Sequence, residues 1–353
     1  MMARDELLGA ARRAAEVLEE FSAKDRINQG YTRVDPTLLA SAAEVTVMYR
    51  PLKKLLGGFL REDGEAGILV NVDRPRGLVH MTCAHELGHY FLGHDSTTDD
   101  TVEIGMSAHL IERQANQFAY SLLAPRWLVI AIMRMKGWSK NHLEKPSVVY
   151  QLSLRLGTSY EAMAWSLARM EVISQASVQR LLANKPKALK LDALHIQDTS
   201  VKLTGDVWIL DKSDKDRIIE PASTDRFVLD LPNHAGTGHL WTVDELRCEG
   251  FTLEPFVHDA RTVSKRSDAP IVVGGLGSGT MRYELAPTNG IVGAESAALQ
   301  RADIAVHETT PWVKGGDSHD TLSFSAEFDD LNPNGGLSRA ERQRRLENVR
   351  GQE

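Results

Sequence analysis

The sequence contains only two cysteines, Cys83 and Cys248, and they are far apart in the chain. Exported domains that rely on disulfides carry more cysteines at closer spacings, so the sequence excludes a disulfide framework. The N-terminal segment carries acidic residues throughout and lacks the apolar region of a signal peptide. We therefore expect a protein of the reducing cytoplasm.

A long apolar run and an excess of positive charge are also missing. No apolar run approaches the ~20 residues that cross a bilayer, so we expect no membrane association. The formal net charge is -7, which gives the molecule as a whole no electrostatic attraction to nucleic acid. What remains is the composition of a globular protein. Its 353 residues predict two or three domains at about 150 residues each.

Helical periodicity dominates the first half of the chain. Apolar residues recur every three or four positions in residues 4–25, which predicts an amphipathic helix. Three short runs, at 45–52, 57–63 and 67–73, predict a small three-stranded sheet. Helical patterns then continue to residue 183, interrupted by a polar loop that follows residue 94. We expect residues 1–183 to form one mainly helical domain.

The character of the sequence changes near residue 184. Residues 184–199 are basic, contain proline and show no sustained period, which indicates a linker. From residue 200 to 331, short β-type runs alternate with Gly, Asn, Asp and Pro, a pattern typical of an antiparallel sandwich or barrel. Residues 332–353 are charged and predict a tail. The expected fold class is therefore α+β, with two unlike domains.

The stretch HMTCAHELGHYFLGHD, residues 80–95, contains the pattern H-E-x-x-H. On a helix His85 and His89 stand on one face, so both imidazoles can bind one ion. Glu86 is rotated by about 100° from His85 and can act on a water molecule without binding the metal. Catalytic zinc takes three protein ligands and leaves the fourth position for water. The motif therefore predicts a catalytic metal site that needs a third ligand.

The third ligand is expected on the next helix, at Glu112. Asn116 follows one helical turn later and can hydrogen-bond a ligating histidine. His94 and Asp95 are nearer in sequence, but His94 lies about 140° round an ideal helix from His89, and Asp95 falls at the expected helix end. We therefore place His94 beside the ligand set, not in it. Two imidazoles and a carboxylate suit Zn2+, and Mn2+ fits the same ligands.

Other polar residues near the motif have weaker claims. Cys83 precedes His85 by two positions and so points to the opposite side of a helix, which predicts a buried apolar role and not a thiolate ligand. Peptide hydrolysis also needs a donor for the developing oxyanion. The candidates that stay open for this role are His94, Tyr90, Tyr120 and Tyr150.

The segment HMTCAHELGHYFLGH, followed by IERQANQFAYSLLAP, resembles the ImmA/IrrE family of metallopeptidases. The similarity extends upstream through VDPTLLASAAEVTVMYRPL and covers roughly residues 5–180. It implies His85, His89 and Glu112 as ligands and Glu86 as general base. It also implies a substrate, a helix-turn-helix repressor whose cleavage switches on stress-response or mobile-element genes. The acidic residue that usually precedes AN is Gln114 here, which leaves the expected ligands unchanged.

Three segments of the β-rich part, NHAGTGHLW, GGLGSGT and TTPW, follow one another in an order similar to that of chagasin-like inhibitors of cysteine proteases. That family is an immunoglobulin-like β-sandwich that presents three loops at one end. The resemblance implies this fold for residues 200–331 and a partner-binding role for Asn233, Thr237, Gly238, Trp241, Gly277 and Trp312. Thr310 stands where the family has an arginine, and the first loop lacks the usual proline. These departures argue against inhibition of a papain-like protease.

Two functions follow from these patterns. The first is a cytoplasmic zinc endopeptidase that cleaves a transcriptional repressor. The second is a sensor or binding module, in which a metal stabilises the helical half, the sandwich captures a protein partner, and proteolysis is weak or conditional. Glu86 favours the first function, because a purely structural zinc site has no need of a general base.

Overall fold

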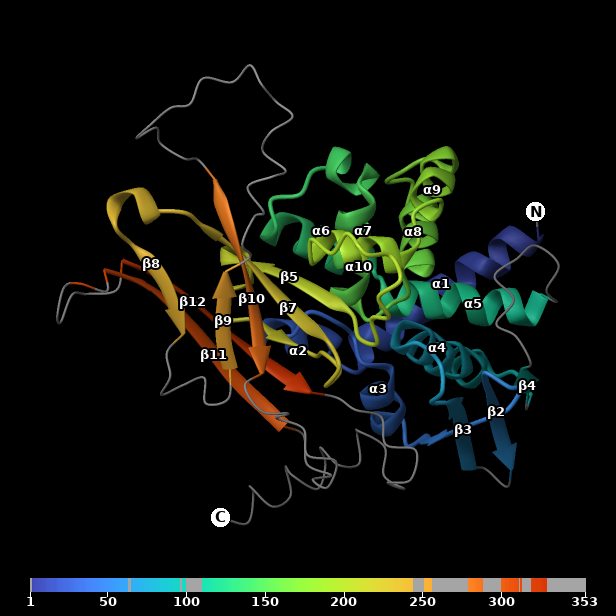
Figure 1. Ribbon diagram of the computed structural model, residues 1–353. Helices are drawn as coiled ribbons and strands as arrows, with labels where there is room; N and C mark the ends of the chain where they lie inside the picture. Colours follow the sequence, from blue (N-terminus) through green and yellow to red (C-terminus); the bar gives the residue numbers. More distant parts are fainter. Residues whose placement is uncertain are drawn as a thin grey trace, which may run out of the picture. The chain divides into compact units, whose positions relative to one another are not determined.

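The computed structural model describes residues 2–62, 65–95, 97–99, 110–243, 251–255, 279–287, 300–310, 312 and 319–328 (Figure 1). The chain divides into two compact units, one mainly Met1–Leu189 and the other mainly Lys190–Ser296 with Gln300–Phe328. The first unit is mainly helical and the second is built of strands, which confirms the mixed α+β fold class. The expected charged tail at 332–353 lies outside the described residues.

The helical unit begins with α1, as the apolar spacing predicts. Asp35 caps α3, because its carboxylate accepts hydrogen bonds from the backbone N–H groups of Thr37 and Leu38, and Pro36 starts the helix. Gly93 ends α4 in the left-handed conformation, at φ 74°. The helices are α1 (Met2–Glu20), α2 (Ala23–Asn28), α3 (Pro36–Ala42), α4 (Arg76–Leu92), α5 (Leu110–Leu123), α6 (Arg126–Met135), α7 (Pro146–Leu156), α8 (Tyr160–Arg169) and α9 (Gln175–Leu182).

The small sheet of the helical unit contains four strands, one more than expected. Its order is β1-β3-β2-β4, with β1 parallel to β3 and the other pairs antiparallel. The added strand, β4, lies in the stretch expected to be a polar loop. An edge strand needs only backbone pairing on one side, so its polar sequence carries no alternating pattern that would reveal it. The strands are β1 (Thr46–Arg50), β2 (Gly57–Glu62), β3 (Glu65–Asn71) and β4 (Thr97–Asp99).

One face of this sheet packs into the same core as α4. Phe59, Ile68 and Val70 on the strands are fully buried, as are Cys83 and Leu87 on α4. The core therefore fixes α4 above the sheet along its whole middle section, where the H-E-x-x-H residues lie.

One stretch of the described residues, Leu110–Met135, is long and apolar enough to cross a membrane by length and composition alone, which departs from the expectation for the sequence. It comprises α5 and α6, which are separated at Pro125. More than half of its most apolar window, 56%, is buried inside the protein. Helices buried in the core of a protein can also be this long and apolar. Phe118 and Leu122 on α5 belong to the core of the helical unit.

The second unit contains two four-stranded sheets with the orders β5-β7-β10-β9 and β6-β12-β11-β8. The Phe227 ring on β7 lies against Phe324 and Phe328 on β12, with centroids 6.5 and 6.4 Å apart, so the sheets pack face to face. Their strands are β5 (Val207–Asp211), β6 (Ile218–Ile219), β7 (Arg226–Pro232), β8 (Leu240–Val243), β9 (Phe251–Pro255), β10 (Thr280–Pro287), β11 (Gln300–Thr309) and β12 (Asp320–Phe328).

Two details of this unit differ from expectation. The pairs β5–β7 and β6–β12 are parallel. After β5 the chain crosses to the other sheet, where it forms β6, and then returns to the first sheet as β7, beside β5. The expected linker also contains a helix, α10 (Pro186–Ala193). Its end is held by packing, since Ala193 and Leu194 are buried against Val207 and Val228. A helix this short gives too few turns for a sustained period to show in sequence.

Candidate metal centre

The helices α4 and α5 bring His85, His89 and Glu112 together. The Nε2 atoms of the two histidines are 3.1 Å apart, and Glu112 reaches His85 Nε2 at 3.2 Å and His89 Nε2 at 3.6 Å, with one carboxylate oxygen for each. Two ligands of a tetrahedral zinc, each ~2.1 Å from the ion, lie about 3.3 Å from one another. The three side chains therefore have the spacing and the chemistry that a zinc ion requires.

Burial and charge at this cluster also suit a cation. Both histidine side chains are fully buried, whereas the Glu112 side chain is 24% exposed, so the cluster can be reached from the glutamate side. Hydrogen bonding from His85 and His89 lowers the pKa of Glu112 far below its usual value. The carboxylate is therefore ionised and offers negative charge to a metal.

Each histidine is held through its other ring nitrogen. His85 Nδ1 lies 3.2 Å from Oδ1 of Asn116, and an amide oxygen can only accept, so Nδ1 donates to Asn116 and Nε2 is the nitrogen that faces Glu112 and would bind a metal. His89 Nδ1 lies 3.0 Å from His94 Nδ1. His94 reaches this position because the chain turns at Gly93, beyond which the ideal helical angle used for the sequence no longer applies.

Glu86 is fully buried on α4, directly after His85. It lies against β2, because a Cβ atom on Gly57 would stand 3.0 Å from Glu86 Oε1 and 2.4 Å from Thr82 Cγ2. The absence of a side chain at Gly57 thus leaves room for the Glu86 carboxylate. Sequence reasoning missed this residue, although the Gly-Gly pair that opens the strand is the signal that could have found it.

Gly88 has a comparable role between the two helices. A Cβ atom there would stand 3.0 Å from Cα and 3.1 Å from the carbonyl oxygen of Ala115, which is tighter than ordinary contact. The glycine therefore lets α5 approach α4 closely enough for Glu112 to reach both histidines. In the sequence it shows only as a helix-weakening residue.

The neighbouring polar residues of the motif differ in their surroundings: Cys83 and His80 belong to other contacts, whereas His94 contacts His89. Burial raises the pKa of the Cys83 thiol far above its usual value, so it stays protonated, in keeping with its place in the core. His80 lies with its Nδ1 2.9 Å from the carbonyl oxygen of Gly157, at the turn that follows α7. Burial lowers the pKa of His94, and a hydrogen bond with Gln114 opposes that change. Gln114 therefore bonds His94, which in turn contacts His89.

The candidates for an oxyanion donor differ in their surroundings. The Tyr90 hydroxyl donates to the carbonyl oxygen of Ala43 over 3.4 Å. Tyr120 lies beneath the Arg169 guanidinium, 3.9 Å from the ring centroid. Tyr150 is buried in the core of the helical unit. His94, which contacts His89, is the candidate that the structure places beside the metal cluster.

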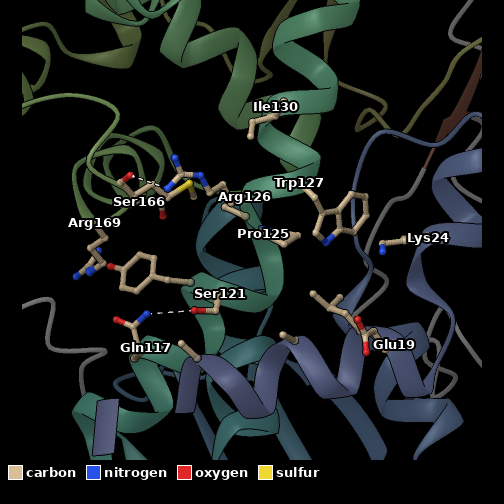
Figure 2. Close-up of a pocket in the computed structure, with 16 residues that line it drawn as sticks. Glu19, Lys24, Gln117, Ser121, Pro125, Arg126, Trp127, Ile130, Ser166 and Arg169 are labelled. Atoms are coloured by element: carbon tan, nitrogen blue, oxygen red, sulfur yellow. Dashed lines mark hydrogen bonds between the residues drawn. The ribbon is translucent and has the colours of Figure 1, made fainter. Parts of the chain in front are cut away.

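A cavity of about 580 Å³ lies elsewhere in the helical unit, among α1, α5, α6 and α8 (Figure 2). Lys24 stands 5.7 Å from the Trp127 ring at one side of it, and Gln117 donates to Ser121 over 3.1 Å along α5. Its lining does not include the metal-binding cluster. The cavity uses a different face of α5, so it is not part of the candidate metal centre.

The residues expected to bind a partner on the second unit fall into two groups. Trp241 is buried and its indole N–H donates to the carbonyl oxygen of Pro232, so its role is in packing. Gly238, with φ 87°, lies beneath Trp312, which is 65% exposed. Asn233 and Thr237 are exposed, and their side chains bond to backbone groups of the same loop. Gly277 lies outside the described residues.

Comparison with known proteins supports the interpretation of the helical unit. Residues 40–167 match the family model of the IrrE N-terminal-like domain, Peptidase_M78. The Peptidase_M78 match extends from α3 into α8 and includes both helices that carry the cluster. It supports a metallopeptidase of the IrrE/ImmA type.

No curated protein matches the chain. Among solved structures, a cysteine protease inhibitor from Entamoeba histolytica is similar, with 14% identity and a TM-score of 0.24 over 35% of this chain and 95% of its own. A likeness at this TM-score carries no argument about function.

Proposed function

We propose that this protein is a zinc-dependent endopeptidase that cleaves a helix-turn-helix transcriptional repressor. The observation that carries the proposal is the convergence of His85, His89 and Glu112 on one point, with the buried Glu86 directly after His85 on the same helix, inside a stretch that matches Peptidase_M78. Mn2+ would fit the same ligand set. A purely structural metal site would not need the second acidic group, Glu86.

The chemistry follows from the residues around the ion. A bound metal would lower the pKa of water toward about 7 and polarise the carbonyl of the peptide bond. Glu86 is one residue beyond His85 on the helix, so its carboxylate can take a proton at the cluster without acting as a ligand. It then returns that proton to the leaving amine. Asn116 and His94 hold the imidazoles in the orientation that ligation needs.

The identity of the substrate rests on the resemblance to the ImmA/IrrE family. The test is co-incubation of the purified protein with a helix-turn-helix regulator encoded beside it, with and without a chelator. We expect cleavage into two fragments, loss of cleavage with the chelator and recovery when Zn2+ or Mn2+ is added back. A Glu86→Gln variant run in parallel separates this activity from that of a contaminating protease.

A second candidate function is a binding module in which proteolysis is weak. The observation that favours it is the exposure of Leu240 and Trp312, 41% and 65%, on the second unit. Tryptophan is among the residues most often found as energetic anchors of protein interfaces, which makes Trp312 the stronger of the two. If this function is the main one, Trp312→Ala abolishes binding of the neighbour-encoded protein, and Glu86→Gln changes nothing in the cell.

A further inference from the structure

A second cluster of metal-ligating side chains lies in the sandwich unit and is independent of the peptidase motif. It consists of His234, just after β7, Glu308, near the end of β11, and His319, just before β12. His234 Nδ1 is 2.8 Å from Glu308 Oε2, and His319 Nδ1 is 3.0 Å from the same oxygen. His319, 11 positions after Glu308, and His234, 74 positions before it, therefore meet at one carboxylate.

The burial of this cluster is uneven. The Glu308 side chain is completely buried, whereas the His234 and His319 side chains are 41% and 52% exposed. A buried carboxylate is costly unless positive charge or hydrogen-bond donors compensate it. Here both imidazoles turn Nδ1 toward it, with their rings open to solvent. An ion from solution can therefore reach the carboxylate from the histidine side.

The set of ligand groups is the same as that of the peptidase cluster. Both clusters contain two histidines and one glutamate, and in each the ligand atoms all lie within 4.8 Å of one another. The separations of 2.8 and 3.0 Å are close to the ~3.3 Å between two ligands of a tetrahedral zinc. We propose that His234, Glu308 and His319 bind a second Zn2+ ion, in a site that serves the sandwich and not the peptidase reaction.

The surrounding contacts indicate what such an ion would do. The backbone N–H of His319 donates to the backbone carbonyl oxygen of Glu308 over 2.8 Å, and Trp312 lies between these two residues in the sequence. His234 belongs to the loop in which Gly238 lies beneath the same tryptophan. The His239 ring packs on His319 with centroids 4.6 Å apart. Zinc would therefore tie the loop of His234 and Gly238 to Glu308 and His319, the two residues that bracket Trp312 in the sequence.

The test is zinc binding by the full-length protein without a histidine tag. The apoprotein is dialysed against ZnCl2, and bound zinc per chain is measured by elemental analysis. We expect two ions for the wild type, one for His85→Ala/His89→Ala and one for His234→Ala/His319→Ala. The variant with all four substitutions binds none. Replacement of both histidines leaves the buried Glu308 carboxylate without these two partners, so circular dichroism is used to check that this variant is folded before its zinc content is compared.

His307→Ala is the matched control, since His307 precedes Glu308 on β11 and bonds Thr321 instead of the cluster. It keeps two ions. Binding of Co2+ to His85→Ala/His89→Ala adds a second readout, because a tetrahedral site gives visible d–d absorption that the four-fold variant lacks. If His85→Ala/His89→Ala binds no zinc, the three residues are only an ion-paired triad. If His234→Ala/His319→Ala binds as much as the wild type, the second ion lies elsewhere. Either result overturns the proposal.

Discussion

Glu112 completes the proposed metal centre, and its removal should be more damaging than that of other acidic residues. Glu112→Ala leaves only two histidine ligands, so we expect zinc affinity to fall at least about 100-fold and cleavage to be lost with it. Elemental analysis after dialysis measures the loss. Glu161→Ala is the control, because Glu161 is likewise an acidic residue in the first turn of a helix. Equal zinc content in both variants would remove Glu112 from the ligand set.

A substitution at Gly57 tests the position of Glu86, the proposed general base, separately from metal binding. A methyl group there would meet Thr82 and Glu86. Gly57→Ala should therefore keep its zinc but cleave about 100-fold more slowly, because a displacement of about 1 Å at a reacting group costs that much. Gly67→Ala on the neighbouring strand is the control, since the nearest atom to its Cβ is 3.9 Å away. Normal cleavage by Gly57→Ala would show that Glu86 does not depend on β2 for its position.

At the scale of elements, the pairing of α4 with α5 decides whether a site forms. Gly88→Ala should force the helices apart and destabilise the fold by about 1–3 kcal/mol through overpacking, despite the better helix propensity of alanine. Gly9→Ala in α1 has nothing within 4 Å of its Cβ and should instead stabilise by up to about 1 kcal/mol. Denaturant unfolding compares the two. A Gly88→Ala variant as stable as Gly9→Ala would contradict the close-packing role.

The elements also show what could be predicted from sequence. The helix that carries the motif and the helix that carries Glu112 were both predictable, because their apolar spacing is a local signal and Pro125 marks the end of the second. The edge strand β4 and the helix α10 were missed, since backbone pairing and a few tertiary contacts form them without a periodic pattern. The approach of His94 to His89 depends on the turn at Gly93, which no helical projection contains.

The same contrast holds for the candidate site. His85, Glu86 and His89 could be read from one short motif. The space beside Glu86 at Gly57 could not, because it depends on where a strand from another part of the chain lies. The cluster of His234, Glu308 and His319 was also missed, since its members come from three segments and match no spacing pattern.

At the scale of the whole molecule, metal binding should be linked to stability. A metal that binds only the folded chain stabilises it by about 2.7 kcal/mol at a free concentration 100 times its Kd. Removal of zinc should therefore lower the Tm of the wild type by several degrees, and that shift should shrink in His85→Ala/His89→Ala. Differential scanning calorimetry measures both. An unchanged Tm after complete removal of zinc would show that the ligands do not need the metal to stay ordered.

In the proposed function, one cluster both holds the metal and cuts the peptide bond. The most direct test is a comparison of Glu86→Gln with the wild type at equal zinc content, with cleavage of the repressor as the readout. Because glutamine preserves shape but cannot accept the proton, we predict full zinc occupancy and a rate at least about 100-fold lower. Cleavage at the wild-type rate by the zinc-loaded variant would contradict the account.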